Sequence, residues 1–120
     1  MGEIMDSPKV LDIEAVMERL EGDRGLFQEV VKIFFEGLPA AIESLRSSAR
    51  SHDGAAFSSA AHACKGALGN IGAMRGWAKA FEMEQAGKKN TLDRADAMIS
   101  EFEQEVAAFR VEYEKYAAGV

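Results

Sequence analysis

Residues 91–116 read TLDRADAMISEFEQEVAAFRVEYEKY. Apolar side chains recur three or four residues apart over this whole length, at Leu92, Ala95, Ile99, Phe102, Val106, Phe109, Tyr113 and Tyr116. Side chains at that spacing share one face of an α-helix. A stripe of this length is typical of a helix that packs in a bundle. We therefore predict a helix over 91–116, with Thr91 as its N-cap.

The same periodicity recurs towards the N-terminus. It predicts three further amphipathic helices, over 23–50, 54–70 and 73–86, and a short one over 12–20. Asp12 is a suitable N-cap for the short helix, and Gly87 is a suitable stop for the helix over 73–86. We expect the longest helix to kink near Gly37 and Pro39, because a proline inside a helix removes a backbone hydrogen bond.

The order of these segments predicts an all-α fold. Four long helices joined by short connections form an antiparallel up-down-up-down four-helix bundle, and the first short helix would cover it as a lid. We expect residues 1–10 to be a flexible lead-in and residues 11–120 to form one domain.

Composition excludes several classes of function. The net charge of −6 argues against binding to nucleic acid, which requires a basic surface, and against binding to an anionic membrane. The sequence has no run of about 18 apolar residues, so we expect no membrane insertion. The single cysteine, Cys64, excludes an internal disulfide and favours a reducing compartment such as the cytoplasm.

Metal and nucleotide sites are also disfavoured. Neither His52 nor His62 follows a glutamate by three residues, the spacing that di-metal bundles use, and one cysteine does not make a zinc site. A glycine-rich phosphate-binding loop is absent as well. We therefore expect no metal, no cofactor and no ATP-binding or autokinase site.

His62 is the residue most suggestive of chemistry. It lies between the inward positions Ala61 and Cys64, so the helical pattern directs its ring away from the core. Gly66 and Gly69 continue its own stripe, and each glycine in a helix costs about 1 kcal/mol relative to alanine. Such a stripe allows another protein's backbone to approach an imidazole. The alternative is an ordinary surface histidine beside glycines that permit close helix packing.

The residues around His62 carry a family resemblance. Residues 61–73 read AHACKGALGNIGA. This segment resembles the signature of histidine-containing phosphotransfer domains, roughly A-H-x-L-K-G-x-x-x-x-x-G-A. One position departs from the pattern, since Cys64 stands where the family usually has a large aliphatic residue. Cysteine packs as a small hydrophobe, so we expect the fold and function to tolerate it.

The resemblance extends beyond the signature, over about residues 10–115. Met83-Glu84 resembles a Leu-Glu pair that the family carries at the same distance beyond its histidine, 21 and 22 residues. Two further pairs, Leu11-Asp12 and Phe34-Phe35, resemble residues in the opening helices of the family.

The resemblance implies a phosphorelay intermediate. His62 would accept a phosphoryl group on Nε2 from a receiver-domain aspartate and pass it to another receiver. Glu84 would accept a hydrogen bond from the Nδ1–H group and so orient the ring, and Lys65 would stabilise the phosphoryl oxygens. We further predict five partner-binding residues, Ser58, Gly66, Gly69, Arg75 and Lys79.

The implied partners are response-regulator receiver domains, either as separate proteins or within a hybrid histidine kinase. The protein would act as a monomer and as a covalent phosphoryl carrier, not as an enzyme with its own substrate. The alternative from another class is a non-catalytic helical bundle that serves as an interaction or scaffold module. That alternative predicts no phosphohistidine.

Overall fold

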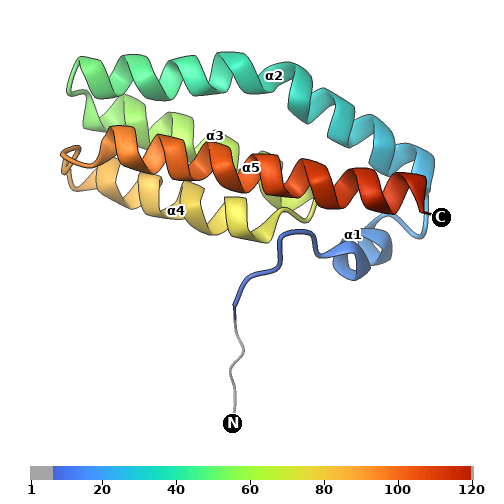
Figure 1. The fold of residues 1–120 in the computed structure, drawn as a ribbon. Helices are drawn as coiled ribbons and strands as arrows, with labels where there is room; N and C mark the ends of the chain where they lie inside the picture. The colour runs from blue at the N-terminus through green and yellow to red at the C-terminus, as the bar shows by residue number, and fades with distance from the viewer. Residues whose placement is uncertain (1–6, 120) are drawn as a thin grey trace, which may run out of the picture.

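The computed structural model describes residues 7–119, which form five helices without a strand (Figure 1). Four of them are long and antiparallel to their neighbours in sequence, so the predicted up-down-up-down bundle is confirmed. The helices are α1 (Ile13–Arg19), α2 (Arg24–Arg50), α3 (Gly54–Asn70), α4 (Met74–Lys88) and α5 (Ala95–Ala118).

The short helix α1 covers one end of the bundle, near the C-terminal end of α5 (Figure 1). Its Val16 is fully buried, and its Arg19 Nη2 donates to the carbonyl oxygens of Gly69 and Asn70 at 2.9 and 3.0 Å. These bonds satisfy the last carbonyls of α3, which have no partner within their own helix. The lid thus stabilises the end of the helix that carries His62.

Most of the predicted lead-in over 1–10 lies outside the described residues. Its last part is tied to the bundle, because the backbone N–H of Arg75 donates to the carbonyl of Lys9 at 3.0 Å. The N–H of Asp12 likewise donates to the carbonyl of Gly72 at 2.8 Å. These two bonds attach the start of the described chain to the α3–α4 turn.

Aspartate side chains begin the first three helices. Asp12, predicted as an N-cap, accepts from the N–H of Ala15, and Asp23 and Asp53 accept in the same way from the third residue beyond them. Each carboxylate satisfies an N–H at a helix start and interacts favourably with the positive end of the helix dipole. The sequence therefore defines these starts locally.

Two predicted boundaries are wrong, both near the α4–α5 connection. Helix α5 begins at Ala95, because the N–H of Thr91 donates to the carbonyl of Ala86 at 2.9 Å and so closes α4 instead of opening α5. Gly87 does not end α4 either, since that helix continues through Lys88. The left-handed conformation that ends α4 is taken by Asn90, with φ of 54°.

Helix α2 remains continuous across Pro39. Its path changes direction midway along its length, as expected where a proline nitrogen cannot donate to the preceding turn (Figure 1). The predicted kink therefore bends the helix without interrupting it.

The core is apolar and rich in phenylalanine. Phe27, Phe57, Phe102 and Phe109 are fully buried and come from three different helices. Cys64 packs among the core residues, as predicted, and burial raises the pKa of its thiol to about 11. A thiol with that pKa remains protonated near neutral pH, so Cys64 contributes packing and not reactivity.

Helices α3 and α4 approach each other backbone to backbone at one end of the bundle. A Cβ placed on Gly87 would lie 2.6 Å from the nitrogen of Ser58 and 2.7 Å from the carbonyl oxygen of Gly54. Gly66, in contrast, has open space where a Cβ would go. Close helix packing therefore depends on Gly54 and Gly87, and not on the glycines next to His62.

This contrast predicts opposite effects of the same substitution. Gly87→Ala should lower the free energy of unfolding by about 1–3 kcal/mol, because the added methyl group overlaps backbone atoms that have little room to move. Gly66→Ala should raise it by up to about 1 kcal/mol through helix propensity. Thermal or urea unfolding of the two variants measures both changes. A stabilised Gly87→Ala protein would contradict the close contact between α3 and α4.

Candidate functional site

His62 lies on the exposed side of α3, with 68% of its side chain accessible. The helical position that points Ala61 and Cys64 into the core turns His62 outward. The imidazole is thus held by a rigid helix and open to a large partner.

A buried carboxylate from α4 holds the inner edge of the ring. His62 Nδ1 lies 2.9 Å from Oε2 of Glu84, whose side chain is only 5% exposed. An ionised carboxylate can only accept, so Nδ1 carries a proton and donates to Glu84. In the neutral ring the other nitrogen, Nε2, then has a free lone pair.

Glu84 is also contacted by two lysines. Lys65 Nζ lies 2.7 Å from Oε1, and Lys88 Nζ lies 3.6 Å from Oε2. The contact with Lys65 lowers the pKa of Glu84 to about 2; burial opposes the shift, and the hydrogen bond from His62 adds to it. Glu84 is therefore ionised at neutral pH and acts as an acceptor for His62.

Lys65 makes contacts that the sequence pattern did not reveal. Its ammonium group is paired with Glu84 and lies over two aromatic rings of α4, those of Trp77 and Phe81, with 20% of the side chain exposed. Sequence periodicity placed Lys65 on the same face as His62 but gave no sign of these contacts. In the structure these contacts hold the ammonium group of Lys65 against Glu84, so it is not free in solvent.

The two predicted glycines remain on the surface near His62. Gly66 is exposed with open space around it, and Gly69 lies beside the indole of Trp77, where a Cβ would be 3.6 Å from Cδ1. Ser58 is more buried, because it packs against Gly87 at the close contact between α3 and α4. It nevertheless lines the same surface hollow as His62.

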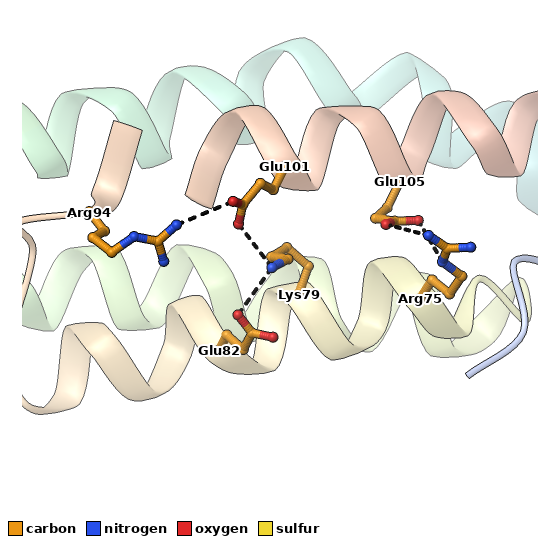
Figure 2. A network of polar contacts seen from close by, with 6 residues as sticks. All are labelled: Arg75, Lys79, Glu82, Arg94, Glu101 and Glu105. Atoms are coloured by element: carbon orange, nitrogen blue, oxygen red, sulfur yellow. Dashed lines mark hydrogen bonds and ion pairs between the residues drawn. The ribbon is translucent and has the colours of Figure 1, made fainter. Parts of the chain in front are cut away.

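Arg75 and Lys79 are engaged with α5, as Figure 2 shows. Arg75 Nε lies 2.9 Å from Glu105 Oε1, and Lys79 Nζ lies 3.0 Å from Glu101 Oε1. Lys79 also contacts Glu82, and Arg94 contacts Glu101, so the charges form a network between the two helices. The structure does not bring these two basic residues to His62.

A surface hollow next to His62 includes residues that sequence reasoning did not select. Besides His62 and Glu84 it is lined by Lys88, Asn90 and the exposed Ser59. Lys88 reads from sequence as an ordinary cation at a helix end. Its spacing of four residues from Glu84 is the signal that could have identified the contact.

Residues 7–119 have no cluster of three or more His, Cys, Asp or Glu side chains that could hold a metal ion. None of the helices in this range is long and apolar enough to cross a membrane.

Comparisons with known proteins identify the family and the fold. The family model described as Hpt domain matches residues 29–112. Histidine-containing phosphotransfer protein B from Pseudomonas aeruginosa PAO1 has a similar structure, with a TM-score of 0.81 and 24% sequence identity over 92% of this chain and 96% of that chain. No curated protein matches at a significant level. Since the family model covers more than half of its length, the chain belongs to the Hpt domain family.

Proposed function

We propose that this chain is a phosphorelay intermediate in which His62 takes a phosphoryl group from the aspartate of one receiver domain and passes it to another. The observation that carries the proposal is the pair formed by His62 and Glu84. Glu84 binds Nδ1 from the buried side at 2.9 Å, which supports an unprotonated Nε2 on the exposed side. A scaffold module would have no use for a buried carboxylate held against an exposed imidazole.

The transfer step needs only groups of the two proteins. The lone pair of Nε2 attacks the phosphorus of the aspartyl phosphate in line, a new N–P bond forms, and the bond to the carboxylate oxygen breaks. The aspartate leaves as a carboxylate, while the Nδ1 proton stays on the ring and is held by Glu84. Attack by a second receiver's aspartate reverses these changes, so the chain is a carrier and not an enzyme.

Lys65 is placed to assist the transfer. Its ammonium group lies on the same carboxylate that holds the ring, so a rotation of its flexible side chain exchanges Glu84 for the oxygens of the incoming phosphoryl group. Any metal ion that the transfer requires would come with the acidic site of the receiver. Receiver domains, in separate proteins or within a hybrid kinase, are the proposed partners, and a monomer presents the whole face to them.

Substitution of Lys65 tests that role. Lys65→Ala should slow transfer about ten- to hundredfold, since a charge-assisted contact with phosphate contributes about 1.5–3 kcal/mol. Lys32→Ala, which removes an exposed lysine of α2, should leave transfer unchanged. Stopped-flow or quench measurements of label transfer, with thermal melts of both variants, give the answer. Equal rates in Lys65→Ala and the parent would reduce Lys65 to a structural partner of Glu84.

Label transfer tests the proposal itself. The protein is incubated with a panel of receiver domains that carry labelled phosphoryl groups, and the product is examined for label that acid releases and base does not. We expect transfer from at least one receiver and return of the label to a second. In a separate incubation with labelled ATP and magnesium the protein should stay unlabelled. Label taken from ATP without another kinase, or no label from any receiver, would contradict the relay function.

A further inference from the structure

A second surface hollow lies between α2 and α5, away from His62. Helix α3 packs against α2 and α4, and α5 packs against the same two helices, so the side shared by α2 and α5 is opposite the side shared by α3 and α4. Every residue that lines this hollow belongs to α2 or α5, and Pro39, at the bend of α2, is one of them (Figure 1). We call it the α2–α5 hollow. Its volume of about 600 Å³ lies within the range typical of small-molecule sites.

The lining of the α2–α5 hollow is mainly apolar. Leu38, Ile42 and Val106 provide aliphatic side chains, and Phe35 provides an aromatic ring. Val111 also lines the hollow and has 51% of its surface accessible, so an apolar side chain is left in contact with water. Apolar groups of a ligand that entered the hollow would leave water and cover this surface, which favours binding.

Two contacts cross the groove between α2 and α5. Arg46 Nη2 donates to both carboxylate oxygens of Glu103, at 3.0 and 3.1 Å, and the guanidinium of Arg110 lies 4.1 Å from the centroid of the Phe35 ring. Glu103 and Arg110 are two turns apart on α5, which is about 10 Å of helix. A helix laid along the groove would have to break both contacts, whereas a small molecule fits between them. The hollow is therefore suited to a short occupant.

Arg110 is the cation of the hollow that has no carboxylate partner. The charge of Glu103 is balanced by Arg46, whereas Arg110 makes no hydrogen bond or ion pair within residues 7–119 and contacts only the face of an aromatic ring. Its planar group offers several N–H donors that match the two oxygens of a carboxylate. Glu114, an exposed residue one turn further along α5, is the opposing charge in the lining.

We propose that the α2–α5 hollow binds a small amphiphilic anion, in which an apolar chain or ring lies against Leu38, Ile42 and Val106 and a carboxylate binds Arg110. The apolar lining accounts for the body of the ligand and the unpaired guanidinium for its charged end. The inference is independent of the proposed function, because no residue of the hollow belongs to α3 or α4. The protein thus has a second binding site on the side opposite its phosphorylation site.

Decanoate is a simple probe for such a site. Calorimetric titration of the full chain, at decanoate concentrations below those that form micelles, should show saturable binding of one molecule per chain. Bound decanoate should also raise the melting temperature, since a ligand that binds only the folded state stabilises it. Decylammonium has the same chain and the opposite charge, and it should bind at least tenfold more weakly. Equal affinities for the two probes, or no saturable binding of decanoate, would overturn the proposal.

Substitution of the charged residues tests how the carboxylate is bound. Arg110→Ala should weaken decanoate binding about tenfold or more, as expected for loss of a charge-assisted hydrogen bond. Arg24→Ala is the matched control, because Arg24 also lies over an aromatic ring, that of Tyr116, but does not line the hollow. It should bind decanoate like the parent. Glu114→Gln removes the opposing charge and should bind a few fold more tightly. Parental affinity in Arg110→Ala would show that the anion is not held there.

Filling the hollow tests its location. Ala107 is exposed on α5 and lines the hollow, so Ala107→Trp should occupy the space, abolish decanoate binding and leave the melting temperature near that of the parent. Ala97→Trp adds the same side chain at an exposed position of α5 outside the hollow and should bind normally. If Ala107→Trp does not fold, Ala107→Leu makes a smaller addition and should weaken binding. Undiminished binding by the folded Ala107 variant would place the ligand elsewhere and contradict the proposal.

The remaining candidate occupant of the hollow is a second copy of this chain. Sedimentation of the parent should give a monomer at the concentrations of the titration, with and without decanoate, and Ala107→Trp should sediment identically. A parental dimer that Ala107→Trp dissociates would assign the hollow to self-association and overturn the proposal.

Discussion

His62→Gln protein is expected to fold like the parent and to accept no phosphoryl label from any donor. Glutamine is a good helix former, and His62 is exposed on α3, so the substitution removes little packing. It removes the only nitrogen that the proposed chemistry uses, and the loss should therefore be complete. Parallel thermal melts and label-transfer assays measure the two properties.

The second histidine provides the matched control. His52 follows α2 in a left-handed turn with φ of 55°, and α3 begins two residues later. His52→Gln should accept label at the parental rate, although the turn could cost it some stability. Label retained by His62→Gln, or lost by His52→Gln, would contradict the assignment of the phosphoryl acceptor.

Glu84→Ala is expected to slow phosphoryl transfer about hundredfold, the size of effect seen when a carboxylate that orients a metal-binding histidine is removed. Without the carboxylate, nothing in the structure fixes the proton on Nδ1, and the lone pair is no longer assigned to the exposed nitrogen. Glu84→Gln keeps an acceptor oxygen of similar reach and should be impaired less. Transfer rates of the two variants, compared at equal receiver concentration, measure the difference. Equal rates in Glu84→Ala and the parent would contradict the orienting role.

The pKa of Glu84 adds a test at low pH. A carboxyl group with a pKa of about 2 in the folded protein and an ordinary pKa of 4.5 when unfolded stabilises the fold fully above pH 4.5. That stabilisation declines as the pH falls from 4.5 towards 2, because the unfolded state then takes up the proton more readily. Glu84→Gln lacks this contribution, so its unfolding free energy should change less over the same range. If the unfolding free energies of the two proteins changed equally with pH, the neighbours of Glu84 would not stabilise its ionised form.

Sequence periodicity predicted the bundle because each long helix needs an apolar face of its own. The same regularity turned Cys64 inward and His62 outward, and the family resemblance singled out Glu84. These properties depend on position within one helix. The structure bears them out for the helices, for the burial of Cys64 and for the exposure of His62.

Contacts between helices were harder to foresee. The pattern could not show that Lys65 contacts Glu84 and the rings of Trp77 and Phe81, or that Lys79 contacts α5. A flexible lysine pairs with whichever side chains the neighbouring helix presents. Thr91 was misassigned for a related reason. A threonine before an apolar run resembles an N-cap, but here its N–H completes the end of the preceding helix.

The uneven distribution of acidic residues has a consequence for long-range approach. All 20 acidic residues lie outside residues 54–81, and the whole chain carries a net charge of −6. An acidic partner is thus repelled by the chain as a whole and less along α3, which carries His62 and Lys65 but no acidic residue, so the electric field favours an approach to that helix. Ions screen such fields beyond about 10 Å at 0.1 M ionic strength. Added salt should therefore weaken the general repulsion of an acidic partner. It should at the same time remove the orientation that the field gives to the approaching partner.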